Sequence, residues 1–266
     1  MLRRSRQQRR SAPARARLLV AVIGCAALFT GHVLSAPLPV GAAGSTVGPA
    51  VAGVSPGTGQ TVGVAHPVTV TFVADVPNRP AAERSISVVP AGAPAPAAGS
   101  FTWLDNRVVE WTPAQFFPAH TPVSVEVGGF ATGFQTGSAV VSVADLSAYT
   151  FTVSIDGEVA RQMPASMGKA KFPTPIGRFT ALEKQRNVTF DSRTIGIPLD
   201  DPEGYLIKGE YGVRVTWGGV YVHSAPWSVG SQGYANVSHG CINLSPDNAA
   251  WYFDTVRVGD PIIVQA

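Results

Sequence analysis

Residues 149–163 read YTFTVSIDGEVARQM, and this stretch indicates the class of fold. Apolar and polar residues alternate on both sides of the dipeptide Asp156-Gly157, as they do in a strand with one buried face. Asp-Gly between two such runs favours a β-hairpin, because both turn positions need a positive φ. The stretch therefore predicts two antiparallel strands joined by a tight turn.

Similar short alternating segments occur on both sides of this hairpin. On its N-terminal side, strands are predicted at 67–76, 85–89, 107–111 and 122–127, with a loop at 90–100. Several short strands at this spacing indicate a small β-sandwich. The residues expected in its core are Phe72, Phe101, Trp103 and Trp111. On the C-terminal side, a turn-rich segment at 172–177 precedes strands predicted at 213–217, 219–223 and 261–264.

One segment carries the signals of a helix start. Ser245 can cap the helix, Pro246 suits its first position, and the run AAWYFDTV follows. The whole chain has 28 Gly and 22 Pro, and only 14% of its residues are charged. That composition favours strands and turns over long charged helices. The predicted fold class is therefore mainly β, with a short helix after Cys241.

These elements divide the chain into four parts. Residues 1–36 are predicted to be an export signal or a membrane anchor, and 37–50 a flexible Gly/Pro-rich spacer. Residues 51–137 form the predicted sandwich, and 138–266 a second, β-rich domain. The Gly-rich segment GGFATGFQTGS, at 128–138, is the predicted boundary between these two domains.

The first 36 residues have the order of an export leader. Seven arginines lie within the first 17 positions, an apolar run follows at 18–30, and a small-x-small end lies at 34–36. A cleaved signal, a lipoprotein with its cleavage box at 22–25, and an uncleaved anchor all remain open. Each alternative places the body in the periplasm or cell wall, with membrane contact only through this segment.

The charge distribution argues against a nucleic-acid partner. The net charge is +3, but removing residues 1–36 leaves 13 basic residues against 17 acidic ones, a net charge of −4. A mildly acidic body gives a nucleic-acid role little support.

Cys241 is the only cysteine of the predicted body, because Cys25 lies in the leader. A lone thiol sent to an oxidising compartment calls for an explanation. The alternatives are a buried inert cysteine, a nucleophile and a metal ligand. In the metal interpretation, His223, His239 and Cys241 would bind zinc and leave a fourth position open.

The nucleophile interpretation starts from NVSHGCIN, residues 236–243. Gly240 would let a substrate carbonyl approach the backbone, and the N–H groups of His239, Gly240 and Cys241 are candidate oxyanion donors. Two histidines compete for the role of base. His239 lies two residues before the cysteine, and His223 ends a predicted strand; spacing alone does not choose between them.

The chain resembles the bacterial peptidoglycan L,D-transpeptidases. Their signature is matched by His223, fourteen intervening residues, and then SHGCIN at 238–243. The resemblance extends to MPASMGK at 163–169, PTPIGRF at 173–179, DSRTIGIP at 191–198 and YVHSAPWS at 221–228. The segment at 53–72 resembles the immunoglobulin-like module that precedes the catalytic domain in some members. The resemblance therefore implies an immunoglobulin-like β-sandwich followed by a β-rich catalytic domain.

The resemblance also implies the role of each site residue. Cys241 would be the nucleophile and His223 the general base, with the backbone carbonyl of Ser224 holding the imidazole tautomer. The residues matching the motif around the oxyanion site are Ser238, His239, Gly240 and Asn243. Those expected at the substrate pocket are Tyr205, Gly219 and Trp227, and Phe190 at a position where the family varies.

The implied reaction is acyl transfer between peptidoglycan stem peptides without a cofactor. Cys241 would cleave the bond between an L-diamino acid and D-Ala, and the thioester would pass to the side-chain amine of a neighbouring stem. Carbapenem β-lactams would be covalent inhibitors. The alternatives are an L,D-carboxypeptidase, with water as acceptor, and a non-catalytic wall-binding protein.

Overall fold

The computed structural model describes residues 48–266. The leader predicted at 1–36 and most of the predicted spacer lie outside the described residues. Within residues 48–266, no helix combines the length and apolar character needed to cross a membrane. The described chain is mainly β, which confirms the predicted fold class.

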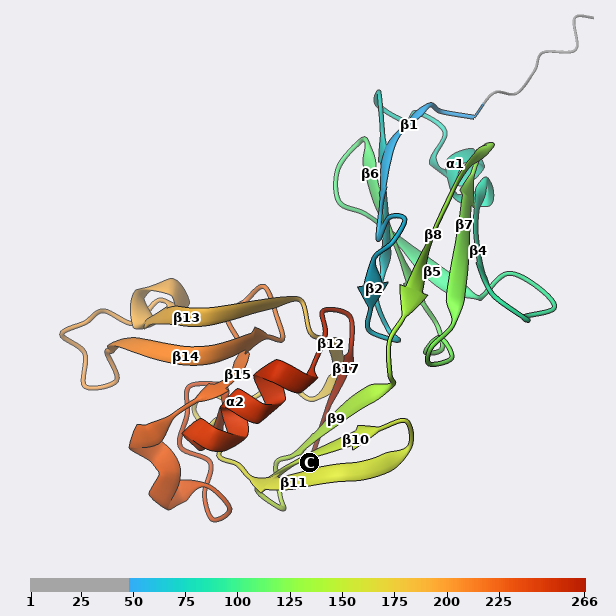
Figure 1. Ribbon diagram of the computed structural model, residues 1–266. Coiled ribbons are helices and arrows are strands. Elements are labelled where there is room, and N and C mark those ends of the chain that lie inside the picture. The colour runs from blue at the N-terminus through green and yellow to red at the C-terminus, as the bar shows by residue number, and fades with distance from the viewer. Residues whose placement is uncertain (1–47) are drawn as a thin grey trace, which may run out of the picture. The chain divides into compact units, whose positions relative to one another are not determined.

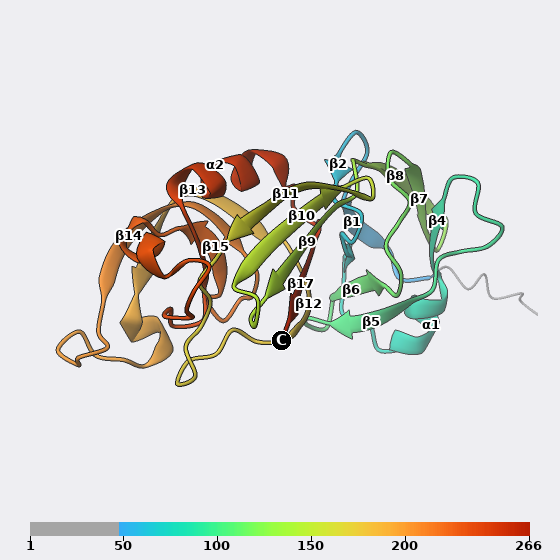
Figure 2. The same cartoon turned by 90° about the horizontal axis from the view of Figure 1, so that it is seen from below.

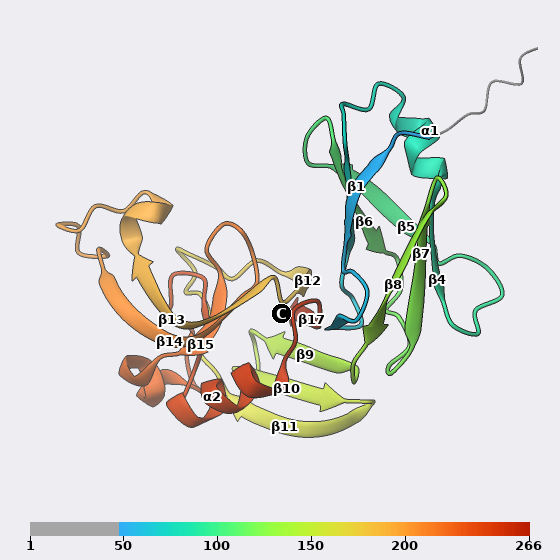
Figure 3. The same ribbon diagram turned by 45° about the horizontal axis from the view of Figure 1, so that its top comes forward.

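Eight strands and one short helix build the sandwich. One sheet has the order β1-β3-β6-β5 and the other the order β2-β8-β7-β4. Figure 3 labels β1, β5 and β6 of the first sheet and β4, β7 and β8 of the second. The elements are β1 (Val51–Ser55), β2 (Thr61–Val62), β3 (Val68–Phe72), α1 (Arg79–Arg84), β4 (Ile86–Pro90), β5 (Gly99–Trp103), β6 (Val108–Pro113), β7 (Pro122–Val127) and β8 (Phe130–Thr136). Phe72 and Trp111 are buried in the core, and Phe101 and Trp103 pack against it, which confirms the predicted core.

The segment 128–138, predicted to contain the domain boundary, is largely the strand β8, and the boundary predicted after residue 137 falls just beyond that strand. β8 pairs with β7 from Phe130 to Gln135, with Gly133 opposite Ser124. A Cβ at Gly133 would lie 2.8 Å from the carbonyl oxygen of Val123. The glycine that suggested a linker therefore permits close approach of two strands. Helix α1 was also not predicted.

The second domain begins with a five-stranded sheet in the order β11-β10-β9-β17-β12, seen in Figure 2. Its strands are β9 (Val140–Asp145), β10 (Thr150–Ile155), β11 (Glu158–Pro164), β12 (Gly177–Thr180) and β17 (Pro261–Gln265). β10 and β11 form the predicted hairpin, in which Asp156 has φ 51° and Gly157 φ 93°. The turn chemistry therefore acts as expected.

A four-stranded sheet follows in the order β13-β14-β15-β16. Its elements are β13 (Glu183–Asp191), the 3₁₀ turn η1 (Ser192–Ile195), β14 (Leu206–Arg214), β15 (Tyr221–Ser224), the 3₁₀ turn η2 (Pro226–Ser231) and β16 (Ile242–Leu244). Helix α2 (Pro246–Thr255) packs on β14 and β15, and Figure 1 shows it beside this sheet.

Two local predictions for this region need correction. The strand predicted at 213–217 ends at Arg214, because the chain then turns, with the N–H of Gly219 bonded to the carbonyl of Thr216. Ser245 does precede α2, but its side chain makes no capping hydrogen bond.

Side chains along β15 and β16 alternate between two faces, one packed in the hydrophobic core and the other facing the site. Val222, Ile242 and Leu244 are fully buried in the hydrophobic core of this domain. Successive side chains point to opposite faces of a strand, so His223 and Asn243 lie on the other face. The same alternation places Cys241, two residues before Asn243, on that face as well.

Candidate active site

Strands β15 and β16 bring the two halves of the motif together. They are parallel, and His223 pairs in register with Asn243. Both residues line one pocket with Cys241, of about 260 Å³. The segment 225–240, between these two strands, therefore leads the chain back to the site. As a result, the Cys241 thiol lies on the same face as the His223 imidazole.

Eight of the predicted site residues line this pocket. They are Phe190, Tyr205, His223, Trp227, Ser238, His239, Cys241 and Asn243. Gly219, Ser224 and Gly240 contribute backbone groups beside it. The pocket also contains residues that the sequence did not single out: Pro202, Glu203, Gly204, Ile207, Ser228 and Val237.

The imidazole of His223 is oriented by the next residue. Its Nδ1 lies 2.8 Å from the carbonyl oxygen of Ser224. A carbonyl only accepts, so Nδ1 carries the proton and Nε2 is left to accept one. This is the tautomer that a general base needs.

Aromatic rings pack around His223, and the burial of its imidazole lowers the pKa. Its ring centroid lies 4.3 Å from that of Phe190 and 5.9 Å from that of Trp227. Burial lowers the pKa of His223 to about 4, against the opposing effects of the Ser224 carbonyl and of Asn243. The imidazole is therefore neutral at pH 7.

The thiol of Cys241 is also protonated at rest. Burial raises its pKa to about 11, and a hydrogen bond from the Tyr221 N–H acts in the opposite direction. The thiol donates to the carbonyl of Gly219 at 3.7 Å, and no hydrogen bond joins it to His223 within the described part of the chain. The resting pair is therefore neutral, and proton transfer belongs to the attack on substrate.

Asn243 has one bonded and one free polar atom. Its Nδ2 donates to Ser228 Oγ at 3.1 Å, which fixes the orientation of the amide. Its Oδ1 is buried and has no hydrogen-bond partner among residues 48–266, and the Asn243 side chain acts to raise the pKa of His223. This amide therefore favours the protonated form of the imidazole.

The motif loop is held by its own hydroxyls. Ser238 Oγ donates to the carbonyl of Cys241 at 2.6 Å and accepts from the N–H of Gly240 at 3.1 Å. Gly240 has φ 118°, and its carbonyl accepts from Thr174 Oγ1 at 2.8 Å. Of the three predicted oxyanion donors, the Gly240 N–H is thus engaged within the loop.

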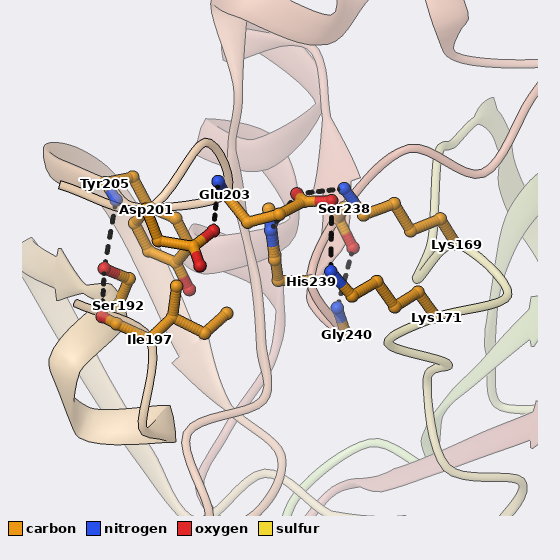
Figure 4. Close-up of polar contacts among 10 residues, drawn as sticks. All are labelled: Lys169, Lys171, Ser192, Ile197, Asp201, Glu203, Tyr205, Ser238, His239 and Gly240. Carbon is orange, nitrogen blue, oxygen red and sulfur yellow. Dashed lines mark hydrogen bonds and ion pairs between the residues drawn. The ribbon is translucent and has the colours of Figure 1, made fainter. Parts of the chain in front are cut away.

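His239 belongs to a different network. Its Nε2 lies 2.8 Å from Glu203 Oε2, and its ring packs against Phe172 and Tyr205 at centroid distances of 4.8 and 5.0 Å. Figure 4 shows this ring with Glu203 beside it. A carboxylate accepts the Nε2 proton, and no hydrogen bond joins this ring to the Cys241 thiol among the described residues.

The metal interpretation finds no cluster of ligands. Across residues 48–266, no three His, Cys, Asp or Glu side chains converge in an arrangement that could hold a metal ion. His223 and His239 instead bond to Ser224 and Glu203.

A mainly β domain with a cysteine and an oriented histidine in one pocket defines a thiol-dependent acyl-transfer enzyme. Models of known families agree: an L,D-transpeptidase catalytic domain matches residues 139–264, and a bacterial Ig domain matches residues 45–128. L,D-transpeptidase 1 of Mycobacterium tuberculosis is 62% identical over 216 residues, covering 81% of this chain and 85% of that protein. The chain belongs to the L,D-transpeptidase family.

Two solved structures extend the comparison. An LD transpeptidase in complex with imipenem is 61% identical, with a TM-score of 0.76, covering 82% of this chain and 99% of the other. L,D-transpeptidase 3 of Mycobacterium tuberculosis, in complex with a faropenem-derived adduct, is 51% identical. Its TM-score is 0.76, and the match covers 82% of this chain and 98% of the other. The protein is thus an L,D-transpeptidase with an immunoglobulin-like domain, as the sequence predicted.

Proposed function

We propose that this enzyme cross-links peptidoglycan stems through their diamino acids. The substrate would be a tetrapeptide stem, and the bond cleaved would join the L-centre of a diamino acid to a terminal D-Ala. The observation that carries the proposal is the neutral Cys241–His223 pair in one pocket, with the Nε2 of His223 left free by the Ser224 carbonyl. That pair suits attack on an uncharged amide carbonyl.

The first half-reaction forms a thioester. Cys241 Sγ attacks the carbonyl carbon as its proton moves to His223 Nε2, and backbone N–H groups stabilise the oxyanion. When the tetrahedral intermediate collapses, the C–N bond breaks and the imidazolium gives its proton to the leaving D-Ala amine. In the second half-reaction, the amine of a neighbouring stem attacks the thioester and loses a proton to His223. The new C–N bond forms as the C–S bond breaks, and His223 gives its proton to Cys241 Sγ, which restores the thiol.

The supporting test supplies purified protein with tetrapeptide stems and analyses the products by mass spectrometry. Dimers lacking one D-Ala are expected from the wild-type protein and none from Cys241→Ala. Tripeptide without dimer would instead indicate an L,D-carboxypeptidase. No product of either kind would contradict the proposal.

We also propose that β-lactams of the carbapenem class acylate Cys241. The imipenem complex and the faropenem-derived adduct of the two related structures support this. Intact mass should rise by one adduct on the wild-type protein and stay unchanged for Cys241→Ala. Labelling that survives the substitution would mean that another residue is the nucleophile.

The proposed substrate lies outside the cytoplasmic membrane, and the Arg-rich leader at 1–36 supports export of the chain to it. Cell fractionation followed by N-terminal sequencing of the mature protein tests this. A protein found in the cytoplasm with its leader intact would contradict export.

A further inference from the structure

Glu203 connects three segments of chain around the pocket. Its carboxylate accepts from Lys169 and from His239, and Lys171 Nζ lies 3.8 Å from Oε1. Figure 4 shows these side chains converging on Glu203. One carboxylate thus joins the segment before β12, the turn before β14 and the catalytic motif.

The turn that presents Glu203 is built rigidly. Ser192, which is fully buried, accepts from the N–H of Tyr205 at 3.0 Å and donates to the carbonyl of Ile197 at 2.9 Å. Asp201 accepts from the N–H of Glu203 at 2.8 Å through Oδ1. Figure 4 also shows these bonds. The carboxylate therefore has a fixed position, which a flexible surface side chain would lack.

The contact of Glu203 with Lys169 is more enclosed than a surface ion pair. The side chains of Lys169, Glu203 and His239 are 29%, 26% and 18% exposed. The Lys169 ammonium, followed by the His239 hydrogen bond, lowers the pKa of Glu203, so the carboxylate is charged throughout the neutral range. A permanently charged acceptor fixes His239 as the tautomer with its proton on Nε2.

His239 links the contact with Glu203 to the backbone that carries the nucleophile. It is followed directly by Gly240 and Cys241, and its ring packs between Phe172 and Tyr205. The backbone on the other side is bound to the same segment, because the N–H of Lys169 donates to the carbonyl of Ser238 at 3.0 Å. Glu203 and Tyr205 both line the pocket.

We propose that Glu203 is a positioning residue for acylation: by binding His239 and Lys169 it fixes the backbone around Cys241 and the Tyr205 wall of the pocket. The inference rests on the proposed acyl transfer at Cys241. Glu203 does not touch the reacting atoms, and it acts through the orientation of His239. A misplacement of the order of an ångström at a reacting centre costs roughly 100-fold in rate.

Three variants separate the parts of the contact. Glu203→Gln keeps an oxygen for His239 and removes the charge, Glu203→Ala removes both, and Lys169→Met removes the cation alone. Glu210→Gln is the matched control, because Glu210 pairs with Arg186 at 3.1 Å and does not line the pocket. A thermal melting curve of each variant shows whether it is folded and how stable it is.

The kinetic readout is carbapenem acylation of Cys241 followed by stopped-flow fluorescence and intact mass. We expect the first-order rate at saturating carbapenem to fall roughly 10- to 100-fold in Glu203→Ala. The loss should be smaller in Glu203→Gln, and the half-saturating concentration should change less than the rate. Glu210→Gln should acylate at the wild-type rate. A wild-type rate in Glu203→Ala would overturn the proposal.

A second readout does not depend on activity. Long-range ¹H–¹⁵N spectra, with the His239 signal assigned by its loss in His239→Gln, should show the Nε2–H tautomer in the wild-type protein and a mixture in Glu203→Ala. An unchanged tautomer in Glu203→Ala would contradict the proposed contact. If the wild-type protein forms neither adduct nor dimer, the proposed function fails, and this spectrum still tests Glu203 separately.

Discussion

His223 and Asn243 are direct register partners on the parallel strands β15 and β16, and both side chains line the pocket. The amide is held by Ser228, and its Oδ1 is buried without a donor from residues 48–266. The Asn243 side chain acts to raise the pKa of His223, so it favours the imidazolium that forms when His223 takes the thiol proton. Stabilising the imidazolium more than the neutral ring is the differential binding that accelerates a reaction.

This relationship makes a prediction for Asn243→Ala. A hydrogen bond to a charged group contributes about 1.5–3 kcal/mol, so acylation by a carbapenem should slow roughly 10- to 100-fold. Ser228→Ala is the control, because it removes the partner of Nδ2 and leaves Oδ1 in place; its loss should be smaller. Equal acylation rates in Asn243→Ala and the wild-type protein would contradict a role in stabilising the imidazolium.

The lowered pKa of His223 predicts the acid limit of acylation. A general base must be neutral, and a group with a lowered pKa stays neutral to a lower pH. Acylation should therefore be lost as the pH falls through about 4, whereas a histidine with an ordinary pKa near 6.5 would lose it about 2.5 units earlier. The measurement is the rate of adduct formation between about pH 3 and 8. An acid limb at 6.5 would mean that the ring is solvated.

The pH dependence of Cys241 reactivity above pH 7 tests whether the thiol is neutral at rest. Because burial raises the pKa of Cys241 to about 11, the thiolate is a minor species between pH 7 and 9, and its fraction rises about tenfold per pH unit across that range. The initial rate of alkylation by iodoacetamide, which follows the thiolate, should accordingly rise with that slope and not level off. A rate that levels off above about 8.5, the ordinary pKa of a cysteine, would indicate a solvated thiol.

Thr174 predicts a coupling between loop structure and acylation. Its hydroxyl is buried, donates to the carbonyl of Gly240 and accepts from the N–H of Gly168 at 2.9 Å. Thr174→Val keeps the shape and leaves both backbone groups without a partner, which should cost about 1–3 kcal/mol of unfolding free energy and slow acylation. Thr174→Ser retains the hydroxyl and should recover most of both. Equal melting temperatures for the Val variant and the wild-type protein would disprove the contact.

Local chemistry made the hairpin and the catalytic pair predictable from the sequence. Asp156-Gly157 adopts the two positive φ values that the tight turn needs, and the motif resemblance identified both His223 and Cys241. The choice between His223 and His239 was open on spacing alone. The choice of His223 is supported by the partners of the two rings, the carbonyl of the neighbouring Ser224 for His223 and the carboxylate of the distant Glu203 for His239.

The features that the sequence did not predict depend on contacts between distant segments. Glu203 contacts His239, 36 residues away, from a turn that Ser192 ties to the preceding segment. The Gly-rich strand β8 was taken for a boundary because glycine indicates flexibility when its neighbours are unknown. Its glycine is required by the approach of Val123 on β7.

Gly240 gives the last prediction, Gly240→Ala. Its φ of 118° is a conformation that residues with a Cβ rarely adopt, and a Cβ there would meet nothing closer than 3.8 Å. The substitution should therefore strain the backbone without a clash, at about 1–3 kcal/mol. The motif loop should relax by shifting the Gly240–Cys241 peptide, so acylation should fall far more than stability. Gly157→Ala is the control, because it has φ 93°, open space around it and a position in the β10–β11 turn; it should lose similar stability and acylate normally. If both variants acylate at the wild-type rate, the conformation of Gly240 is not required for the reaction.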